Sequence, residues 1–220
     1  MTGLLELEAH SAPPAAGGAP RELVVLLHGY GADGRDLLGL APYWARLLPH
    51  AEFVAPNAPF PCEMSPYGFQ WFSFENRSPE LLRAGAQAAA AILNGFLDDL
   101  LRTRGLQDDR LALVGFSQGT MMALQVAPRR ARPVAGVLGF SGALLAPELL
   151  PQEAVSRPPV LLVHGDVDQV VPFAELGNAT AALKSAGFEA DSLALPGLAH
   201  GIDERGLARG GRFLAEILAG

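Results

Sequence analysis

Short apolar runs rich in valine and leucine alternate with longer helical patterns, and this alternation constrains the fold more than any other feature of the chain. The apolar runs cover residues 23–27, 52–55, 110–114, 133–140, 159–163 and 188–195. The helical patterns lie between and after them, at residues 37–48, 79–103, 118–127, 172–186 and 203–218. Continuous apolar strands that alternate with helices predict a mostly parallel sheet with helices on both faces.

Proline and glycine mark the ends of two predicted helices. Pro79 and Pro172 suit the first turn of a helix, and Gly105 and Gly187 suit the position just past its end. Residues 4–8 alternate in polarity, which predicts a short edge strand near the N-terminus.

Composition places the chain among globular proteins. Its 220 residues are 50% hydrophobic and 18% charged, which predicts one packed domain over residues 1–220 rather than a disordered chain. The net charge of −7 argues against nucleic acids and anionic membranes as partners. The N-terminus lacks the basic start of a signal peptide, and no apolar run approaches about 18 residues, so we expect a cytoplasmic protein without a membrane span. The single cysteine, Cys62, excludes an internal disulfide and a cysteine-based zinc cluster.

The most specific local motif is Gly115-Phe116-Ser117-Gln118-Gly119, which has the form G-x-S-x-G between a predicted strand and a predicted helix. In that context the serine projects from a tight turn, and small residues flank it where the backbone is crowded. The start of the following helix offers free N–H groups that favour negative charge. The motif therefore predicts a nucleophilic Ser117, and the alternative is a glycine-flanked serine in an ordinary turn.

A serine nucleophile requires a general base, and the base requires an acid that orients it. In folds with this motif the chain order is serine, acid, histidine. Of the five histidines, His164 and His200 follow Ser117, and His164 precedes the candidate acids. This order leaves His200 as the base. Asp166 and Asp168 both follow the preceding strand. We choose Asp168 from its loop placement and expect Asp166 to stabilise a turn.

Two backbone N–H groups are needed to bind the oxyanion of the reaction intermediate. One should belong to Gln118, directly after the nucleophile. The other should come from the loop after an early strand, where the glycine-flanked turn at residues 26–31 indicates Tyr30. His28 lies in the same turn but precedes the serine in the chain, so we interpret it as a side chain that tethers loops.

Four segments occur in order along most of the chain: LLHGYGADGRDL, PNAPFP with QWFSF, ALVGFSQGTMMAL, and LLVHGDVDQVVP with GLAHGID. Together they resemble the bacterial phospholipase/carboxylesterase family, a branch of the α/β-hydrolases that includes acyl-protein thioesterases. The resemblance implies the α/β-hydrolase fold, a triad of Ser117, Asp168 and His200, and backbone oxyanion donors at Tyr30 and Gln118.

The chain departs from the family pattern at two places near the expected substrate. Tyr30 stands where leucine is common, and Ser73 follows Trp71-Phe72 where the family has aspartate. Neither change touches the predicted triad, but both alter the surroundings expected for an acyl-protein substrate.

These observations predict a serine hydrolase that cleaves short- to medium-chain carboxylic esters through an acyl-Ser117 intermediate, with lysophospholipids and thioesters as further substrate types. The alternatives are a lactonase, peptidase or depolymerase on the same fold, or a ligand-binding member without catalysis. We expect a small-molecule ester as partner and no metal or cofactor, and the sequence leaves a homodimer open.

The loops at residues 56–78 and 141–157 are longer than simple connections between a strand and a helix. The first is rich in aromatic residues and is the predicted substrate wall, with core packing as the alternative for each candidate: Met64, Tyr67, Phe69 and Trp71.

Overall fold

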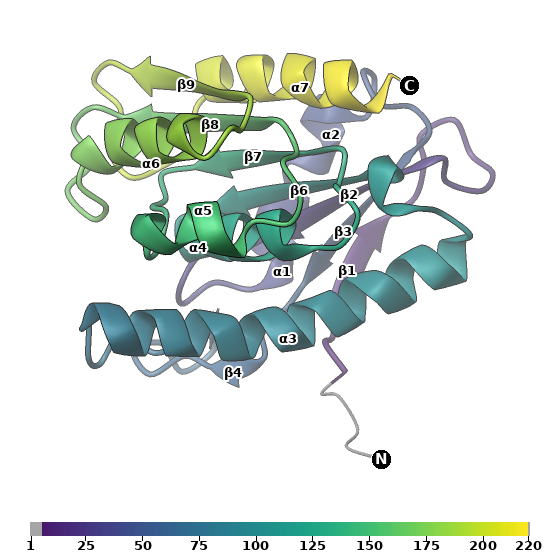
Figure 1. Ribbon diagram of the computed structural model, residues 1–220. Helices are drawn as coiled ribbons and strands as arrows, with labels where there is room; N and C mark the ends of the chain where they lie inside the picture. Colours follow the sequence, from purple (N-terminus) through teal and green to yellow (C-terminus); the bar gives the residue numbers. More distant parts are fainter. Residues whose placement is uncertain (1–5, 220) are drawn as a thin grey trace.

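The computed structural model describes residues 6–219, and its centre is a seven-stranded sheet (Figure 1). The strand order is β1-β3-β2-β6-β7-β8-β9, and β1 is antiparallel to β3 while the other neighbours pair in parallel. This arrangement confirms the predicted mostly parallel sheet. The strands are β1 Ala9–Ala12, β2 Glu22–Leu27, β3 Ala51–Pro56, β6 Leu111–Phe116, β7 Gly136–Phe140, β8 Val160–Gly165 and β9 Ala190–Leu195.

Helices cover both faces of the sheet, and Figure 1 shows α3 and α7 on opposite sides of it. One hydrophobic core lies between the sheet and α1, α2 and α7, and a second lies between the sheet and α3, α4 and α6. Within the described residues, no helix combines the length and apolar character needed to cross a membrane. The helices are α1 Gly34–Leu38, α2 Ala41–Trp44, α3 Pro79–Arg104, α4 Gln118–Val126, α6 Ala174–Ser185 and α7 Glu204–Leu218.

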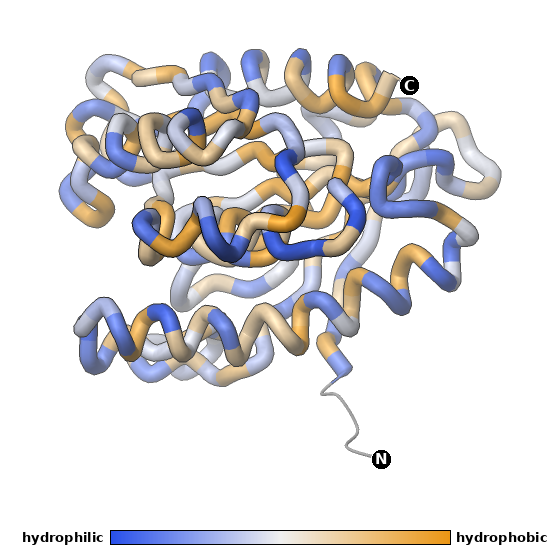
Figure 2. Tube along the Cα trace, viewed as in Figure 1, coloured by the Kyte–Doolittle hydropathy of each residue, from blue (hydrophilic) through white to orange (hydrophobic). Residues whose placement is uncertain are grey.

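Strand β2 shows why the strands are apolar along their whole length. Leu23, Val25 and Leu27 pack into the core beneath α3 and α4, whereas Val24 and Leu26 pack into the opposite core. All five side chains are fully buried, because a parallel strand between two helical layers has no face toward water. Figure 2 shows hydrophobic strands in the middle of the molecule and mixed hydropathy along the covering helices.

The structure differs from the sequence prediction at the chain start and in the first helical region. Residues 4 and 5 of the expected edge strand lie outside the described residues, residues 6–8 form no strand, and β1 follows them. The single helix expected at 37–48 is two short helices. The first ends at Leu38 with Gly39 as its C-cap, and Pro42 lies in the first turn of the second. Proline lacks an N–H group and so fits the first turn of a new helix rather than a helix interior.

The predicted helix ends are confirmed at three of four positions. Pro79 is the first residue of α3, and Gly105 ends that helix in a left-handed conformation with φ of 66°. Gly187 follows α6 with φ of 84°. Pro172 instead lies before α6, which begins at Ala174.

The loops at the carboxyl ends of the parallel strands meet at one edge of the sheet, where open α/β sheets bind their ligands. The two long loops follow β3 and β7 and are both partly ordered by local structure. Residues 56–78 contain a small antiparallel hairpin formed by β4 (Phe60–Pro61) and β5 (Phe69–Gln70). Residues 141–157 contain the short helix α5 (Leu150–Glu153).

Candidate active site

Ser117 lies on the sharp turn between β6 and α4. Its φ of 53° and ψ of −115° fall outside the regions that residues with side chains normally occupy. A Cβ atom at Gly119 would overlap the Leu27 carbonyl group, and one at Gly115 would overlap the backbone of Gly119. Because the backbone is this crowded, both flanking positions require glycine, and the serine is held in the strained turn that a nucleophile needs.

Asp168 and His200, the predicted acid and base, contact each other directly. The distance between His200 Nδ1 and Asp168 Oδ2 is 2.7 Å. An ionised carboxylate only accepts hydrogen bonds, so Nδ1 carries the proton and Nε2 remains as the basic nitrogen. The other carboxylate oxygen accepts hydrogen bonds from the backbone N–H groups of Val170 (2.8 Å) and Val171 (2.9 Å). These contacts fix both the acid and the orientation of the imidazole.

The environment of Asp168 favours its ionised form. Burial raises the pKa of this carboxyl group, but the hydrogen bonds from His200 and from the backbone of Val171 and Val170 outweigh burial and lower the pKa below its ordinary value. The side chain is fully shielded from solvent, whereas 17% of the His200 side chain is exposed. Asp168 can therefore stabilise a positive charge on His200 when the imidazole accepts a proton.

A second imidazole also contacts Asp168, which sequence reasoning did not anticipate. His164 Nε2 lies 3.2 Å from Asp168 Oδ2 and 3.1 Å from the Val171 carbonyl oxygen. Its position at the end of β8, four residues before Asp168, was visible in the sequence, but chain order excluded it as the base. The structure gives His164 a supporting place beneath the loop that carries the acid.

Asp166 joins two loops of the site. Its Oδ1 accepts a hydrogen bond from the Gly197 N–H group at 2.7 Å, and its own N–H donates to the Leu195 carbonyl at 3.2 Å. These bonds connect the loop after β8 to the loop after β9, which carries His200. Asp166 therefore stabilises the loops as expected, although its partner lies across the site rather than within its own turn.

The His28 imidazole connects the turn that carries Tyr30 to the loop after β3. Its Nδ1 lies 2.7 Å from the Gly29 carbonyl, and the Ala58 N–H donates to its Nε2 at 2.9 Å. A carbonyl only accepts, so Nδ1 carries the proton; Nε2 accepts a hydrogen bond and carries none, so the ring is neutral. Burial lowers the pKa of His28, which keeps the neutral form. These contacts confirm the interpretation of His28 as a tether.

Ser117, His200 and Tyr30 line one cavity of about 610 Å³ at the carboxyl edge of the sheet. Gln118 is the first residue of α4, so its N–H group belongs to the set at a helix start that has no partner within the helix. The cavity wall is largely apolar and draws on several loops and helices. Its apolar members are Ala32, Met64, Phe74, Leu82, Phe116, Met121, Ala143, Leu145, Val170, Val171 and Pro172.

Charged side chains also line this cavity, and most of them are acidic. Asp36, Glu63, Glu75 and Glu175 contribute carboxylates, against one guanidinium group from Arg77. Hydrogen bonds from Ser73 and Gln70, the two strongest influences, lower the pKa of Glu63, so this carboxylate is ionised at neutral pH. The cavity therefore has a largely apolar wall, and most of its charged side chains are negative.

The structure brings one of the four predicted substrate contacts to this cavity. Met64 lines it although this residue is 82% exposed, whereas Tyr67, which is 91% exposed, does not line it and Phe69 packs against the core. Trp71 is 0% exposed and belongs to the core, which corrects its predicted place in the substrate wall. The sequence could not make this distinction, because the loop folds back as a hairpin and its aromatic side chains point in different directions. The wall residues that sequence reasoning missed, such as Met121 and Leu145, come from other segments and carry no local signal.

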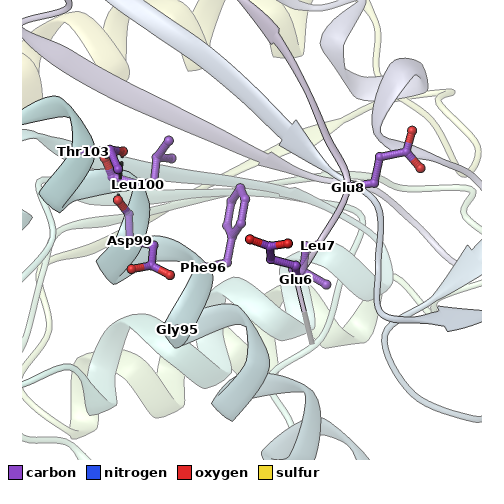
Figure 3. A pocket seen from close by; sticks show the side chains of 8 residues that line it. All are labelled: Glu6, Leu7, Glu8, Gly95, Phe96, Asp99, Leu100 and Thr103. Atoms are coloured by element: carbon purple, nitrogen blue, oxygen red, sulfur yellow. Dashed lines mark hydrogen bonds between the residues drawn. The ribbon is translucent and has the colours of Figure 1, made fainter. Parts of the chain in front are cut away.

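A second cavity of about 490 Å³ lies between residues 6–8 and helix α3. It contains none of the residues that sequence reasoning assigned to the reaction. Over residues 6–219, no group of three histidine, cysteine, aspartate or glutamate side chains is arranged to hold a metal ion. Figure 3 shows the side chains around this cavity, which are Glu6, Leu7, Glu8, Gly95, Phe96, Asp99, Leu100 and Thr103.

Known proteins are similar to this chain over most of its length. The family model described as Phospholipase/Carboxylesterase matches residues 12–218. Esterase YpfH of Escherichia coli K12 is 28% identical over 190 residues, which cover 85% of this chain and 79% of that protein. Acyl-protein thioesterase 1 of Schizosaccharomyces pombe is 31% identical over 163 residues, which cover 68% of this chain and 69% of that protein. The crystal structure of esterase PE8 is 43% identical and superposes with a TM-score of 0.92, covering 97% of this chain and 100% of that one.

Proposed function

The chain belongs to the phospholipase/carboxylesterase family, and on this premise we propose that it is a serine hydrolase of carboxylic esters. In this proposal Ser117 is the nucleophile, His200 the general base and Asp168 the acid that orients it. The observation that carries the proposal is the 2.7 Å contact between His200 Nδ1 and Asp168 Oδ2 at a cavity that the strained Ser117 also lines. Esterases and an acyl-protein thioesterase among the relatives support the same reaction class.

The acylation step begins when His200 Nε2 takes the proton of the Ser117 hydroxyl group and Oγ attacks the carbonyl carbon of the ester. The carbonyl oxygen becomes an oxyanion, which the backbone N–H groups of Tyr30 and Gln118 bind. Removing one such donor typically lowers kcat by about 10²–10³. The bond from the carbonyl carbon to the leaving oxygen or sulfur then breaks, and the proton on Nε2 passes to the leaving group.

The second half of the reaction returns the enzyme to its starting state. His200 Nε2 takes a proton from water, and the hydroxide attacks the acyl carbon on Ser117. The bond to Oγ breaks as the proton returns to the serine, and the carboxylic acid leaves. Throughout both steps Asp168 stays ionised and stabilises the imidazolium form of His200.

The cavity is suited to bind an uncharged substrate with an apolar acyl or alcohol part. A volume of about 610 Å³ lies within the range of about 300–1,000 Å³ that is usual for small-molecule sites. Its wall suits a short- to medium-chain acyl group, and its four carboxylates disfavour anionic esters. The proposal extends to a single-domain, cytoplasmic enzyme that needs no cofactor and does not bind nucleic acid.

Labelling with a fluorophosphonate, followed by hydrolysis of p-nitrophenyl esters from acetate to palmitate, tests the proposal. The expected result is one covalent label on Ser117 and turnover of short to medium esters. A protein that remains unlabelled would be a non-catalytic member of the fold. A labelled protein that cleaves lactones, peptides or polyesters but none of these esters would be one of the alternative hydrolases.

A further inference from the structure

Trp71 contacts both segments that supply the proposed oxyanion donors. Its indole Nε1–H group donates to the His28 carbonyl oxygen at 3.0 Å, in the turn that leads to Tyr30. Its backbone N–H group donates to Gln118 Oε1 at 2.9 Å. One buried residue therefore joins the end of β2 to the start of α4.

The Gln118 side chain completes this connection from the other side. It is 0% exposed, and its Nε2 donates to the Phe72 carbonyl oxygen at 2.8 Å. The carboxamide thus pairs with the backbone of two successive residues, Trp71 and Phe72. If the amide turned away, it would lose both bonds. A buried polar group without a partner is costly, so the amide is held in this orientation. This pairing fixes the first residue of α4 against the loop after β3.

The same loop also holds the Tyr30 turn through its backbone. The Gly31 N–H group donates to the Phe69 carbonyl at 2.9 Å, and the Phe69 N–H group donates to the Ala32 carbonyl at 2.8 Å. A Cβ atom at Gly68 would overlap the Gly31 backbone, so the two segments approach as closely as glycine allows. Residues 68–72 therefore bind both halves of the oxyanion site.

We propose that Trp71 is a positioning residue that sets the relative placement of the Tyr30 and Gln118 backbone N–H groups. The inference rests on the proposed function, which supplies these two donors. Trp71 is fully buried and does not line the cavity, so it acts through the two loops and not on the substrate. An oxyanion donor works at about 2.7–3.1 Å from the oxygen of the transition state. Displaced loops weaken transition-state binding more than substrate binding.

The chain offers a matched control in its second tryptophan. Trp44 is 1% exposed, and its Nε1–H group donates to the Leu207 carbonyl at 3.0 Å. This bond joins α2 to α7 in the core on the opposite face of the sheet. Substituting phenylalanine for either tryptophan removes one buried indole hydrogen bond of the same length, so the two variants differ in what that bond holds.

The experiment compares Trp71→Phe and Trp44→Phe with the wild-type enzyme. It measures kcat and KM for p-nitrophenyl butyrate, Ki for an alkyl trifluoromethyl ketone that mimics the tetrahedral intermediate, and the melting temperature. We expect Trp71→Phe to lower kcat at least about tenfold and to raise Ki by a similar factor, while KM changes little, because small misplacements cost up to about 10²-fold. Trp44→Phe should keep kcat and Ki within about twofold of wild type, with a comparable fall in melting temperature.

Equal kcat and Ki values in the two variants would overturn the inference and leave Trp71 as a packing residue. A rise in KM with unchanged kcat would overturn it as well, because it would indicate a substrate contact. If Trp71→Phe does not fold, Gln118→Met keeps the backbone donor but removes both side-chain bonds, and it should give the same paired change in kcat and Ki. A wild-type protein that neither hydrolyses the ester nor takes the fluorophosphonate label would refute the proposed function itself, which is a separate failure.

Discussion

Asp168 Oδ2 and His200 Nδ1 lie 2.7 Å apart although the two residues are 32 positions apart in the chain. The two residues follow β8 and β9, which are adjacent parallel strands in register from Val160 with Ala190 to Gly165 with Leu195. Since parallel neighbours end at the same edge of the sheet, their following loops meet. The acid–histidine contact is therefore a consequence of strand order.

Ser117→Ala should lower kcat by about 10⁴–10⁶ and abolish fluorophosphonate labelling, because it removes the nucleophilic oxygen while leaving the fold in place. A suitable control is Ser156→Ala, because Ser156 does not line the cavity. This variant removes a buried hydroxyl group that donates a 3.0 Å hydrogen bond to the Ala127 carbonyl oxygen. This control should retain its activity. Ester hydrolysis near the wild-type rate in Ser117→Ala would exclude the proposed mechanism.

The two aspartates should separate catalysis from stability. Asp168→Asn should lower kcat by roughly 10⁴, because an amide in this position favours the wrong tautomer of His200. Asp166→Asn should keep most of the activity and lose about 1 kcal/mol of stability through its weakened bond to the Gly197 N–H group. Steady-state kinetics and chemical denaturation of both variants test this prediction, and the reverse pattern would exchange the two roles.

The buried His28 should make the protein less stable as the pH falls below about 6.5. Burial lowers the pKa of His28 in the folded protein, whereas in the unfolded chain it titrates near 6.5. Between these two values the unfolded state binds more protons, so the free energy of unfolding decreases with falling pH. Asp168 has a lowered pKa as well, and its contribution is present above about pH 3.9 and is lost below that, as the pH falls through the folded pKa.

Melting temperatures measured from pH 7.5 to pH 4 test this dependence. The wild-type protein should begin to lose stability near pH 6.5, and His28→Gln should be less stable at neutral pH but show a flatter profile between pH 6.5 and pH 5. A wild-type melting temperature that stays constant over that interval would contradict a neutral, buried His28.

Two neighbouring loop residues should differ in their effect on chain-length preference. Both are largely exposed, at 82% for Met64 and 91% for Tyr67, but only Met64 lines the cavity. Met64→Ala should reduce kcat/KM for longer esters more than for acetate, with about 0.8 kcal/mol for each methylene that loses its contact. Tyr67→Ala is the matched control and should leave the ester series unchanged. A uniform effect of Met64→Ala at every chain length would remove Met64 from the substrate wall.

Local chemistry explains why much of the site could be predicted from the sequence. The glycines around Ser117 were recognisable because a sharp strand-to-helix turn forbids side chains at both positions. Chain order then left His200 as the base, and the apolar strand runs indicated a sheet that is buried on both faces. These signals depend on neighbours in the sequence or on the order of elements, which a single chain displays directly.

By itself, the sequence determined the fold class, the predicted nucleophile and the candidate base, since each follows from local backbone chemistry and the order of elements. Only the tertiary structure showed that Asp168 contacts His200 while Asp166 contacts Gly197, because the two aspartates occupy the same loop and their partners lie on another. It also moved Trp71 from the predicted substrate wall into the core, where it contacts both proposed oxyanion segments. The direction in which a loop side chain points depends on packing between distant segments, and residue type alone does not encode it.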